Sequence, residues 1–409
     1  MQLSNVMRRL AGTGTSVEFR AYDGSRCGPP DAAVRLDIRN PRALTYLVTS
    51  SGELGLARAY VSGDLGIEGD LYDALRALAN NQIGQLSWPE RWEVLRSVGV
   101  KTLRPVAPPP EEVRVRRWRP RSKATDKKAI SHHYDVSNRF YEWVLGPSMA
   151  YTCAVFPRPD ATLEEAQAEK FDLVCRKLAL RPGMRLLDVG CGWGGMVLHA
   201  TRHYGVRALG VTLSRQQAEW AQKAIADAGL SDHAEVRWGD YRDVAETGFD
   251  AVSSIGLTEH IGLRQLPAYF RFLHTKLRPQ GRLLNHCIMR PTTRERARAG
   301  AFISRYVFPN GELEGLGTIV AAMQDNGFEV RHEENLREHY AKTLAVWCAN
   351  LDAHWDEAVR EVGVGTARVW LLYMAGSRLG FERNSIQLHQ VLGVKTVDGQ
   401  AAFPLRPDW

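Results

Sequence analysis

The pattern of hydrophobic and polar positions divides the chain into two parts of different character. In the first part, short runs typical of β-strands at residues 17–22 and 34–38 precede a mainly helical stretch at residues 41–60. The pair Asp23-Gly24 between the two strand-like runs is typical of a turn. This order predicts a small α+β domain over residues 1–104.

From about residue 129 onward, buried-strand runs alternate with runs of helical period. The strands are predicted at residues 184–189, 206–212, 234–238, 249–255 and 281–288, and the helices at residues 194–204, 215–228 and 266–277. Strands that alternate with helices of this length favour a parallel sheet with helices on both faces. We therefore expect an α/β, Rossmann-like domain over residues 129–409.

Between these two parts lies a polar segment, residues 105–128. It contains the run Pro108-Pro109-Pro110, and residues 114–128 carry eight lysines and arginines against one acidic residue. This composition predicts a solvated linker rather than a packed core. The same stretch, with Trp118 inside it, would also suit contact with phospholipid headgroups, and the sequence leaves both interpretations open.

Composition narrows the function classes without choosing one. The 409 residues are 44% hydrophobic and 24% charged, as in an ordinary globular protein, and the net charge of +7 favours anionic partners. The six cysteines form no CxxC pair, which argues for a reducing cytosol and against a metal site. We find no signal peptide and no run of eighteen apolar residues, so we expect a cytoplasmic protein, peripheral on the inner face of the membrane.

The strongest single motif is a glycine-rich loop after the first α/β strand, where residues 186–195 read LLDVGCGWGG. Glycines let the backbone turn sharply and approach a ligand, and the helix that follows offers free N–H groups. Dinucleotide-binding folds use the same device, but they expect an acidic residue at the end of the second strand, where residues 210–214 read GVTLS. Asp188 before the first glycine instead favours S-adenosylmethionine (SAM).

A second motif, GDYRD at residues 239–243, follows the third predicted strand. A carboxylate there, Asp240, can accept a hydrogen bond from the adenine amine while the ring of Tyr241 stacks on the base. Because Asp at a strand end is also a common turn residue, this motif gains weight only beside the glycine loop.

Several motifs together resemble the cyclopropane-fatty-acyl-phospholipid synthase family, whose members are SAM-dependent alkene alkylases. They include the glycine-rich loop, GVTLS at 210–214 and GDYRD at 239–243. The others are HHYDVSN at 132–138, YTCA at 151–154, SIG at 254–256 with Glu259 and His260, His286, FPNG at 308–311, Tyr340 and IQL at 386–388. The N-terminal region resembles the extra, lipid-binding-type domain of the longer members. Thr258 stands where many members carry an aromatic residue, and Asn285 stands where an apolar residue is usual. The resemblance therefore does not determine the shape of the pocket.

The resemblance implies a class I SAM-dependent methyltransferase domain with two sets of site residues. The implied SAM site comprises Tyr151, Thr152, Gly190, Gly192, Thr212, Leu213, Gln217, Tyr241 and Arg242, to which the motifs add Asp188, Gly194 and Asp240. The resemblance also implies an active-site bicarbonate held by Cys153, Glu259, His286, Tyr340 and the backbone of Ile255.

The implied reaction adds a one-carbon unit to the cis double bond of an unsaturated phospholipid acyl chain. An alkene is a poor nucleophile, and its alkylation leaves a carbocation, so the site should be dry and lined by aromatic rings. The candidate wall residues are Phe140, Tyr141, Trp143, Tyr269 and Phe308. Bicarbonate can then remove a proton. Ring closure would give a cyclopropane, whereas a hydride shift would give a methylene branch for a separate reductase.

Two other kinds of methyltransferase fit part of the pattern. A nucleic-acid methyltransferase would suit a basic SAM enzyme, but we find no Asp/Asn-Pro-Pro-aromatic motif after the fourth strand and no nucleic-acid module, so we expect no such partner. A small-molecule O- or N-methyltransferase would not explain the N-terminal region.

Three features predict contact with a membrane surface: the net charge, the basic stretch at 114–128 and a mildly amphipathic start. The amphipathic positions are Leu3, Val6, Met7 and Leu10, and the basic residues Arg290, Arg294, Arg296 and Arg298 are expected on the same face. The longer family members suggest a homodimer.

Overall fold

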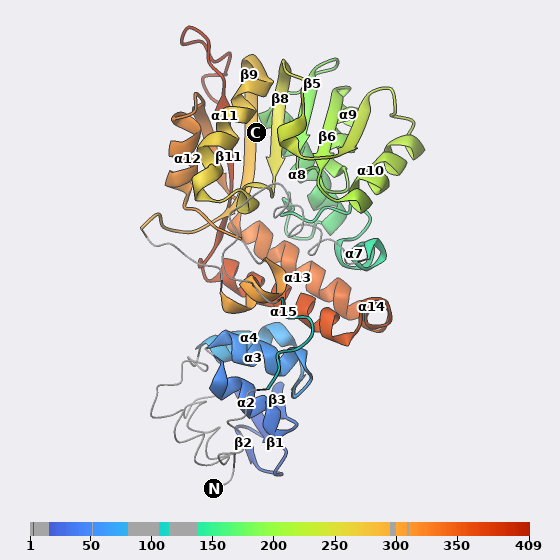
Figure 1. The fold of residues 1–409 in the computed structure, drawn as a ribbon, viewed down its shortest axis with the longest axis vertical. Coiled ribbons are helices and arrows are strands. Elements are labelled where there is room, and N and C mark those ends of the chain that lie inside the picture. Colours follow the sequence, from blue (N-terminus) through green and yellow to red (C-terminus); the bar gives the residue numbers. More distant parts are fainter. Residues whose placement is uncertain are drawn as a thin grey trace. The chain divides into compact units, whose positions relative to one another are not determined.

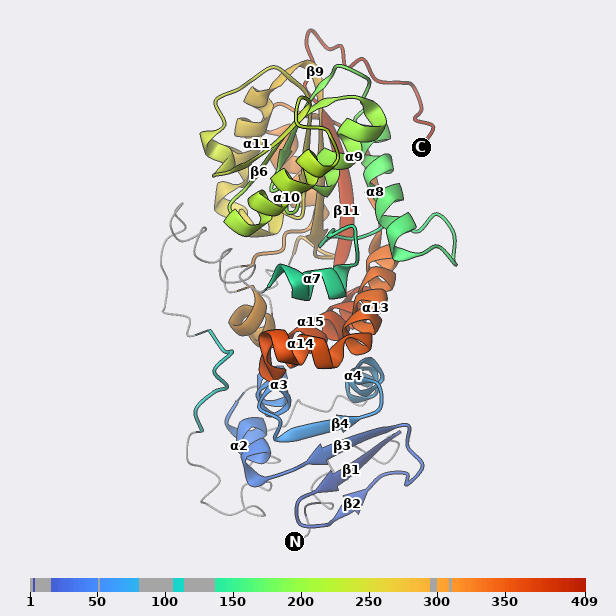
Figure 2. The ribbon, with the colours of Figure 1, turned by 90° about the vertical axis from the view of Figure 1, so that its right-hand side faces the viewer.

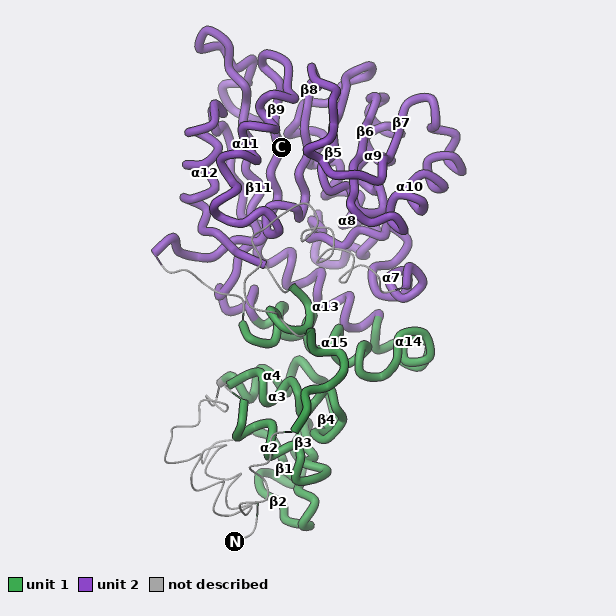
Figure 3. Tube along the Cα trace, viewed as in Figure 1, with its two compact units in different colours: residues 1–116, 300–309, 351–379 green, residues 117–299, 310–350, 380–409 purple. Residues whose placement is uncertain are grey.

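The computed structural model describes residues 3, 16–50, 52–80, 106–113, 137–294, 300–308 and 311–409 (Figure 1). The chain forms two compact units: residues 1–116, 300–309 and 351–379 make the smaller one, and residues 117–299, 310–350 and 380–409 make the larger one (Figure 3). The smaller unit therefore joins residues 300–309 and 351–379 to the N-terminal residues, whereas the sequence predicted one domain for all residues after 128. Those domain bounds stay a prediction.

The larger unit is built around a seven-stranded sheet in the order β10-β11-β9-β8-β5-β6-β7. Its strands are β5 (Arg185–Val189), β6 (Arg207–Thr212), β7 (Ala234–Trp238), β8 (Phe249–Ile255), β9 (Leu277–Met289), β10 (Glu329–Asn335) and β11 (Gln387–Val394). Strands β9, β8, β5, β6 and β7 pair in parallel, whereas β11 is antiparallel to both β9 and β10. The predicted α/β class is confirmed, with a mixed sheet in place of an entirely parallel one.

Helices cover both faces of this sheet (Figures 1 and 2): α8 (Leu163–Lys177), α9 (Gly195–Tyr204) and α10 (Arg215–Asp227) on one face, and α11 (Leu266–Lys276) and α12 (Leu316–Gln324) on the other. Helices α7 (Asn138–Leu145) and α13 (Arg337–Ala353) lie beyond the ends of the strands. The 3-10 turn η2 (Tyr241–Asp243) follows β7, and the turns η3 (Thr258–His260) and η4 (Leu263–Gln265) follow β8. Leu186 belongs to a core shared with α8, α9 and α10, and its neighbour Leu187 belongs to a core shared with α11 and α12. Burial of both faces explains why the strand sequences are continuously apolar.

The smaller unit contains a four-stranded sheet in the order β2-β1-β3-β4 (Figure 2). Its elements include β1 (Val17–Ala21), β2 (Arg26–Cys27), β3 (Val34–Ile38), α2 (Pro41–Thr49), α3 (Glu53–Val61), β4 (Leu65–Glu68), α4 (Leu71–Asn80), the π-helical turn η5 (Ile303–Val307), α14 (Trp355–Val362) and most of α15 (Val364–Glu382). The expected α+β class is confirmed. The mainly helical stretch expected at 41–60 forms two helices, because Ser50 is extended (ψ 145°) and Gly52 takes a positive φ of 51°.

One end of the predicted linker is packed into this smaller unit. The Glu112 side chain is 5% exposed and accepts two hydrogen bonds of 2.6 Å from Arg58 in α3, one of 2.9 Å from Arg305 and one of 3.2 Å from the Tyr306 hydroxyl. Residues 106–113 are therefore held to the smaller unit by an ion cluster, which a freely solvated linker would lack. The basic stretch at 114–128 lies outside the described residues.

The features expected to meet a membrane have mixed outcomes. Arg290 was expected on an exposed basic face, but it is buried, with hydrogen bonds to Leu313 O at 2.6 Å and Glu314 at 3.2 Å, so that expectation is wrong. Leu3 is buried as well, whereas residues 4–15 and 295–299 are outside the described part of the chain. Among the described helices, none is both long and apolar enough to cross a bilayer.

Candidate active site

The glycine-rich loop joins β5 to α9 at the carboxyl end of the parallel strands. Gly190, Gly192 and Gly194 have φ values of 73°, 55° and 83°, a region that favours glycine. A Cβ on Gly194 would lie 2.8 Å from the Cβ of Ala221, so this glycine is needed for the close packing of α9 against α10. The N–H of Gly190 donates to Val211 O at 2.9 Å and fastens the loop to β6.

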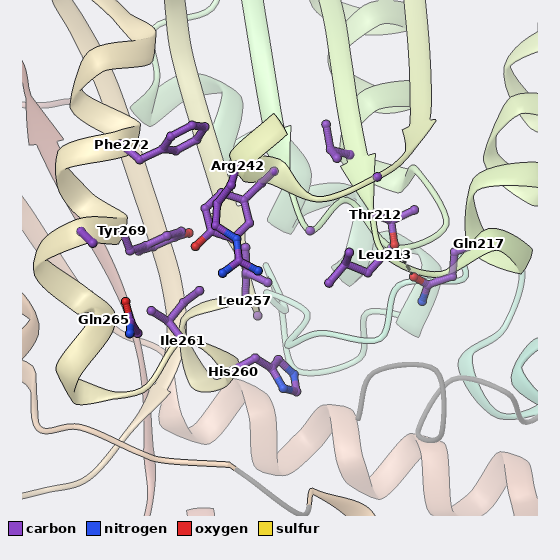
Figure 4. Close-up of a pocket in the computed structure, with 17 residues that line it drawn as sticks. Thr212, Leu213, Gln217, Arg242, Leu257, His260, Ile261, Gln265, Tyr269 and Phe272 are labelled. Carbon is purple, nitrogen blue, oxygen red and sulfur yellow. Dashed lines mark hydrogen bonds between the residues drawn. The ribbon is translucent and has the colours of Figure 1, made fainter. Parts of the chain in front are cut away.

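A pocket of about 180 Å³ opens beside this loop (Figure 4). One side carries predicted cofactor residues, namely Gly190, Gly192, Thr212, Leu213, Gln217, Tyr241 and Arg242. The other side comes from the end of β8, from η3 and η4 and from α11, and comprises Gly256, Leu257, His260, Ile261, Gln265, Ala268, Tyr269 and Phe272. Ligands of α/β folds bind at this end of the sheet. None of the residues on the second side was predicted from the sequence to contact SAM.

Hydrogen bonds fix the polar side chains of the pocket. Thr212 Oγ1 donates to Gln217 Oε1 at 2.8 Å, so the Gln217 amide nitrogen remains as a donor for a ligand (Figure 4). Asp240 is buried and does not line the pocket; it accepts from the guanidinium of Arg242 at 2.5 and 2.7 Å. Asp240 therefore orients Arg242, whose side chain lies in the pocket.

Asp188 lies in β5, directly before the glycine-rich loop. Its Oδ1 accepts a hydrogen bond of 2.6 Å from Ser253 on β8, and the residue is buried. Burial raises the pKa of Asp188 to about 6, against the opposing effects of Ser253 and Lys170. Since the pocket lining leaves out Asp188, Gly194, Asp240, Tyr151 and Thr152, their contact with SAM stays a prediction.

Helix α8 holds the loop that carries Tyr151, Thr152 and Cys153. Gln167 Nε2 donates to Thr152 O at 2.9 Å, and Lys170 Nζ donates to Thr152 Oγ1 at 3.0 Å. Both side chains are fully buried, and neither was singled out from the sequence. A Cβ on Gly256 would lie 3.2 Å from Thr152 Cγ2, so Thr152 adjoins the pocket wall.

The predicted bicarbonate residues on the sheet lie close together in the strand register. Ile255 and His286 are neighbours in the β8–β9 pair, and Gly256 N donates to His286 O at 2.8 Å. Glu259 in η3 accepts a hydrogen bond of 2.7 Å from Ile288 N through Oε1. Its carboxyl group is therefore held two residues along β9 from His286.

The remaining two residues, Cys153 and Tyr340, connect to the same strands through Leu336. Leu336 N donates to Leu388 O at 2.8 Å, and Leu388 pairs with Ile288 across β11 and β9. Leu336 O accepts from Tyr340 N at 3.2 Å and from Cys153 Sγ at 3.8 Å. A continuous set of contacts thus brings all the predicted bicarbonate residues to one end of the sheet.

Two buried polar atoms of this cluster have no hydrogen-bond partner among the described residues: His286 Nε2 and Glu259 Oε2. Burial raises the pKa of Glu259 to about 7 and lowers the pKa of His286 well below its usual value, to which Lys170 and Lys177 add. Burial also raises the pKa of the Cys153 thiol, which therefore stays protonated. A buried polar atom without a partner costs free energy, so these two atoms need a partner outside the described contacts.

Aromatic rings surround the same region. The ring centroid of Tyr151 lies 5.9 Å from that of Tyr141 and 5.5 Å from that of Trp347, which in turn lies 6.1 Å from Tyr340. Trp193 of the glycine loop lies 4.8 Å from Tyr141. Together these rings form a wall that joins the predicted SAM and bicarbonate residues.

The wall differs in part from the expected one. Phe140 and Tyr141 are buried in it, and Tyr269 lines the pocket. Trp143 is half-buried under Arg139, and Phe308 packs on Tyr373 within the smaller unit. Residues 132–136, which carry most of the predicted HHYDVSN motif, lie outside the described residues.

The two departures from the family pattern contact each other. Thr258 Oγ1 donates to Asn285 Oδ1 at 2.6 Å, and both residues are buried. Asn285 points to the α11 face of β9, opposite to His286, and its amide also contacts Cys287 Sγ at 3.3 Å. The hydrogen bond between Thr258 and Asn285 therefore ties η3, which carries Glu259, to β9 on the α11 face of the sheet.

The seven-stranded sheet, the glycine loop and the pocket beside it define a class I SAM-dependent methyltransferase. The chain belongs to the mycolic acid cyclopropane synthetase family, whose model matches residues 121–391. It is 57% identical over 423 residues to a probable fatty acid methyltransferase of Mycobacterium tuberculosis, covering 100% of this chain and 98% of that protein. A probable fatty acid methyltransferase of Pseudomonas putida is 39% identical, over 95% of this chain and 94% of that protein.

Solved structures agree with this assignment. The crystal structure of a mycolic acid cyclopropane synthase complexed with SAH and CTAB superposes with a TM-score of 0.63 at 34% identity, covering 66% of this chain and 98% of that chain. The predicted fold class, family resemblance and SAM dependence are confirmed. The roles of the individual site residues stay predictions.

Proposed function

We propose that this enzyme transfers a one-carbon unit from SAM to the cis double bond of an unsaturated phospholipid acyl chain. In this proposal the alkene attacks the methyl group, the resulting carbocation loses a proton to bound bicarbonate, and the product is a cyclopropane fatty acid. The observation that supports this chemistry best is the pair of unpaired buried atoms, His286 Nε2 and Glu259 Oε2.

These two atoms match the hydrogen-bonding groups of bicarbonate. His286 Nδ1 lies 3.2 Å from the amide nitrogen of Gln390, which can only donate, so a neutral His286 has its hydrogen on Nε2. Nε2–H would donate to a bicarbonate oxygen, and ionised Glu259 would accept the bicarbonate O–H through Oε2. One donor and one acceptor would orient the anion and keep its basic oxygen for the proton of the substrate.

The aromatic wall fits the charge that develops on the acyl chain. A carbocation must be kept from water, and the faces of Tyr141, Tyr151 and Trp347 are negative enough to stabilise it. The bound cofactor would supply the electrophilic methyl group. The residues of the chain orient the reactants and exclude water.

The alternative product is a methylene-branched fatty acid, the precursor of a 10-methyl chain. It requires the same first step, followed by a hydride shift before proton loss, and a separate reductase would then saturate the branch. The two relatives described above are both named probable fatty acid methyltransferase, a name that fits either product. A small-molecule O- or N-methyltransferase is a more distant alternative.

The test is incubation with methyl-labelled SAM and oleoyl phospholipid, followed by mass analysis of the acyl chains. A gain of one labelled CH2 on the acyl chain supports the proposal, and a label on any other molecule contradicts it. Gas chromatography of the methyl esters after mild hydrogenation separates the two products, because a methylene is reduced to a branch and a ring survives.

Three further expectations stay proposals: peripheral attachment to the inner face of the membrane, a homodimer and the absence of a nucleic-acid partner. Flotation with anionic liposomes at low and high salt tests the first, since each basic residue near the surface adds about 1 kcal/mol that salt removes. Sedimentation equilibrium tests the second. Nuclease treatment that abolishes activity would contradict the third.

A further inference from the structure

A buried glutamine contacts Nδ1 of His286, and a buried lysine contacts that glutamine. Gln390 is opposite His286 in the β9–β11 pair, and both residues are almost completely buried. Lys177, the last residue of α8, is fully buried and donates to Gln390 Oε1 at 2.8 Å. Its ammonium group also forms an ion pair with Glu334.

These contacts determine which way the glutamine amide faces. An ammonium group has three donors and no acceptor, so the atom of Gln390 that meets Lys177 must be the carbonyl oxygen. The amide nitrogen must then face His286 Nδ1, at 3.2 Å. Turning the amide around would set its NH2 group against the Lys177 ammonium, donor against donor, between two buried side chains.

The glutamine in turn determines the tautomer of the histidine. An amide NH2 group has no acceptor, so Nδ1 of His286 must accept and carries no hydrogen. Burial and the two nearby lysines hold the pKa of His286 well below its usual value, so the ring is neutral. A neutral imidazole has one hydrogen, and here only Nε2 is left to carry it.

We propose that Lys177 and Gln390 are positioning residues that hold His286 in the tautomer with its hydrogen on Nε2, where it donates to an anion in the active site. This inference rests on the proposed role of His286 as a bicarbonate ligand. The opposite tautomer would present a lone pair at Nε2 and repel the anion. Neither positioning residue belongs to the set implied by the family resemblance.

The charge of Lys177 has a second effect at the same place. Lys177 sits at the carboxyl end of α8, where the helix dipole favours a cation, and its ion pair with Glu334 opposes the lowering of its pKa by burial. The ammonium disfavours protonation of His286, which keeps the ring neutral. The ion pair therefore orients Gln390 and also prevents an imidazolium from forming.

The test compares Gln390→Glu with the wild-type enzyme. A carboxylate at position 390 can only accept, so it should draw the hydrogen of His286 to Nδ1. Gln390→Met, which removes the dictating contact without adding charge, is the second variant in case the glutamate variant does not fold. Gln222→Glu is the matched control, because Gln222 donates to Val236 O at 2.8 Å and does not belong to the described pocket lining.

The direct readout is the nitrogen-15 spectrum of the full chain labelled at histidine, with His286 assigned from its own substitution by asparagine. We expect a pyrrole-type Nε2 and a pyridine-type Nδ1 in the wild type and in Gln222→Glu, and a protonated Nδ1 in Gln390→Glu. A wild-type spectrum with the hydrogen on Nδ1 would overturn the proposal.

The functional readout is turnover of oleoyl phospholipid as a function of bicarbonate concentration. We expect Gln390→Glu and Gln390→Met to need at least tenfold more bicarbonate for half-maximal rate, with the KM for SAM changed less than twofold. An altered tautomer with unchanged bicarbonate dependence would also refute the inference. A wild-type enzyme that alkylates no phospholipid would contradict the proposed function instead, and the nitrogen spectrum would still decide the tautomer.

Discussion

Replacing Lys170 by methionine tests whether a buried charge is retained at a cost to stability. Lys170 is completely buried in α8, donates to Thr152 Oγ1 at 3.0 Å and lies 3.6 Å from the centre of the Phe171 ring. Among the described residues, no carboxylate forms an ion pair with it. Burial lowers its pKa from the usual 10.5 to about 7, although Cys153 and Asp188 oppose this.

The size of the effect follows from that shift. A fall from 10.5 to about 7 corresponds, at about 1.4 kcal/mol per pH unit, to about 4–5 kcal/mol of lost stability when the amine is charged. Between these pH values the unfolded chain binds a proton that the folded protein has released, so the wild type becomes more stable as the pH rises. Below pH 7 both states are protonated and the full cost remains.

We therefore expect Lys170→Met to be about 2–4 kcal/mol more stable than the wild type at pH 7, after subtracting about 1 kcal/mol for the lost hydrogen bond. The gain should shrink towards pH 10. Urea denaturation from pH 6 to 10, analysed with a common m value, measures both effects. The same variant should bind SAM more weakly by calorimetry, because Thr152 is a predicted cofactor residue.

Lys395→Met is the matched control. Lys395 donates to His274 O at 3.0 Å and Leu277 O at 2.8 Å, so its removal leaves two carbonyl groups unpaired and should destabilise the protein. If Lys170→Met is less stable than the wild type at pH 7, or if its stability difference does not change with pH, the reasoning about an uncompensated buried charge fails.

Four other substitutions test the site. Thr258→Val and Asn285→Leu should each lower the free energy of unfolding by about 1–3 kcal/mol, because each leaves a buried partner unpaired. In urea denaturation the double variant should lose less than the sum of the two single losses. Strict additivity would show that the 2.6 Å hydrogen bond does not contribute to stability. Because burial raises the pKa of Glu259 to about 7, kcat should rise with pH through about 7, and Glu259→Gln should remove that rise; an unchanged profile would exclude the carboxylate. Gly194→Ala should lower stability by about 2 kcal/mol or more through its φ of 83° and its approach to Ala221, as thermal unfolding would show; a stable variant would contradict the packing role.

The sequence predicted the strands and helices whose hydrophobic pattern and flanking turn residues are both visible locally. Residues 234–238 and 249–255 form β7 and β8 with the expected bounds, because Gly239 ends the first and Gly248 and Gly256 flank the second. It did not predict β10, where EVRHEEN alternates charged residues along a half-exposed edge, or β11, where buried His389 and Gln390 interrupt the apolar pattern. Polar residues that are satisfied by distant partners look like surface residues in a sequence.

The sequence alone determined the cofactor loop and the class of chemistry. Three glycines in one loop permit the positive φ values that the loop adopts, and the spacing of the motifs identifies the family without any coordinates. The tertiary structure alone decided which residues support that loop. Lys170 and Lys177 lie in the highly charged sequence LEEAQAEKFDLVCRK, yet both are completely buried. Burial, charge state and the tautomer of His286 depend on partners 18 to 213 residues away along the chain, and only folding brings those partners within hydrogen-bond distance.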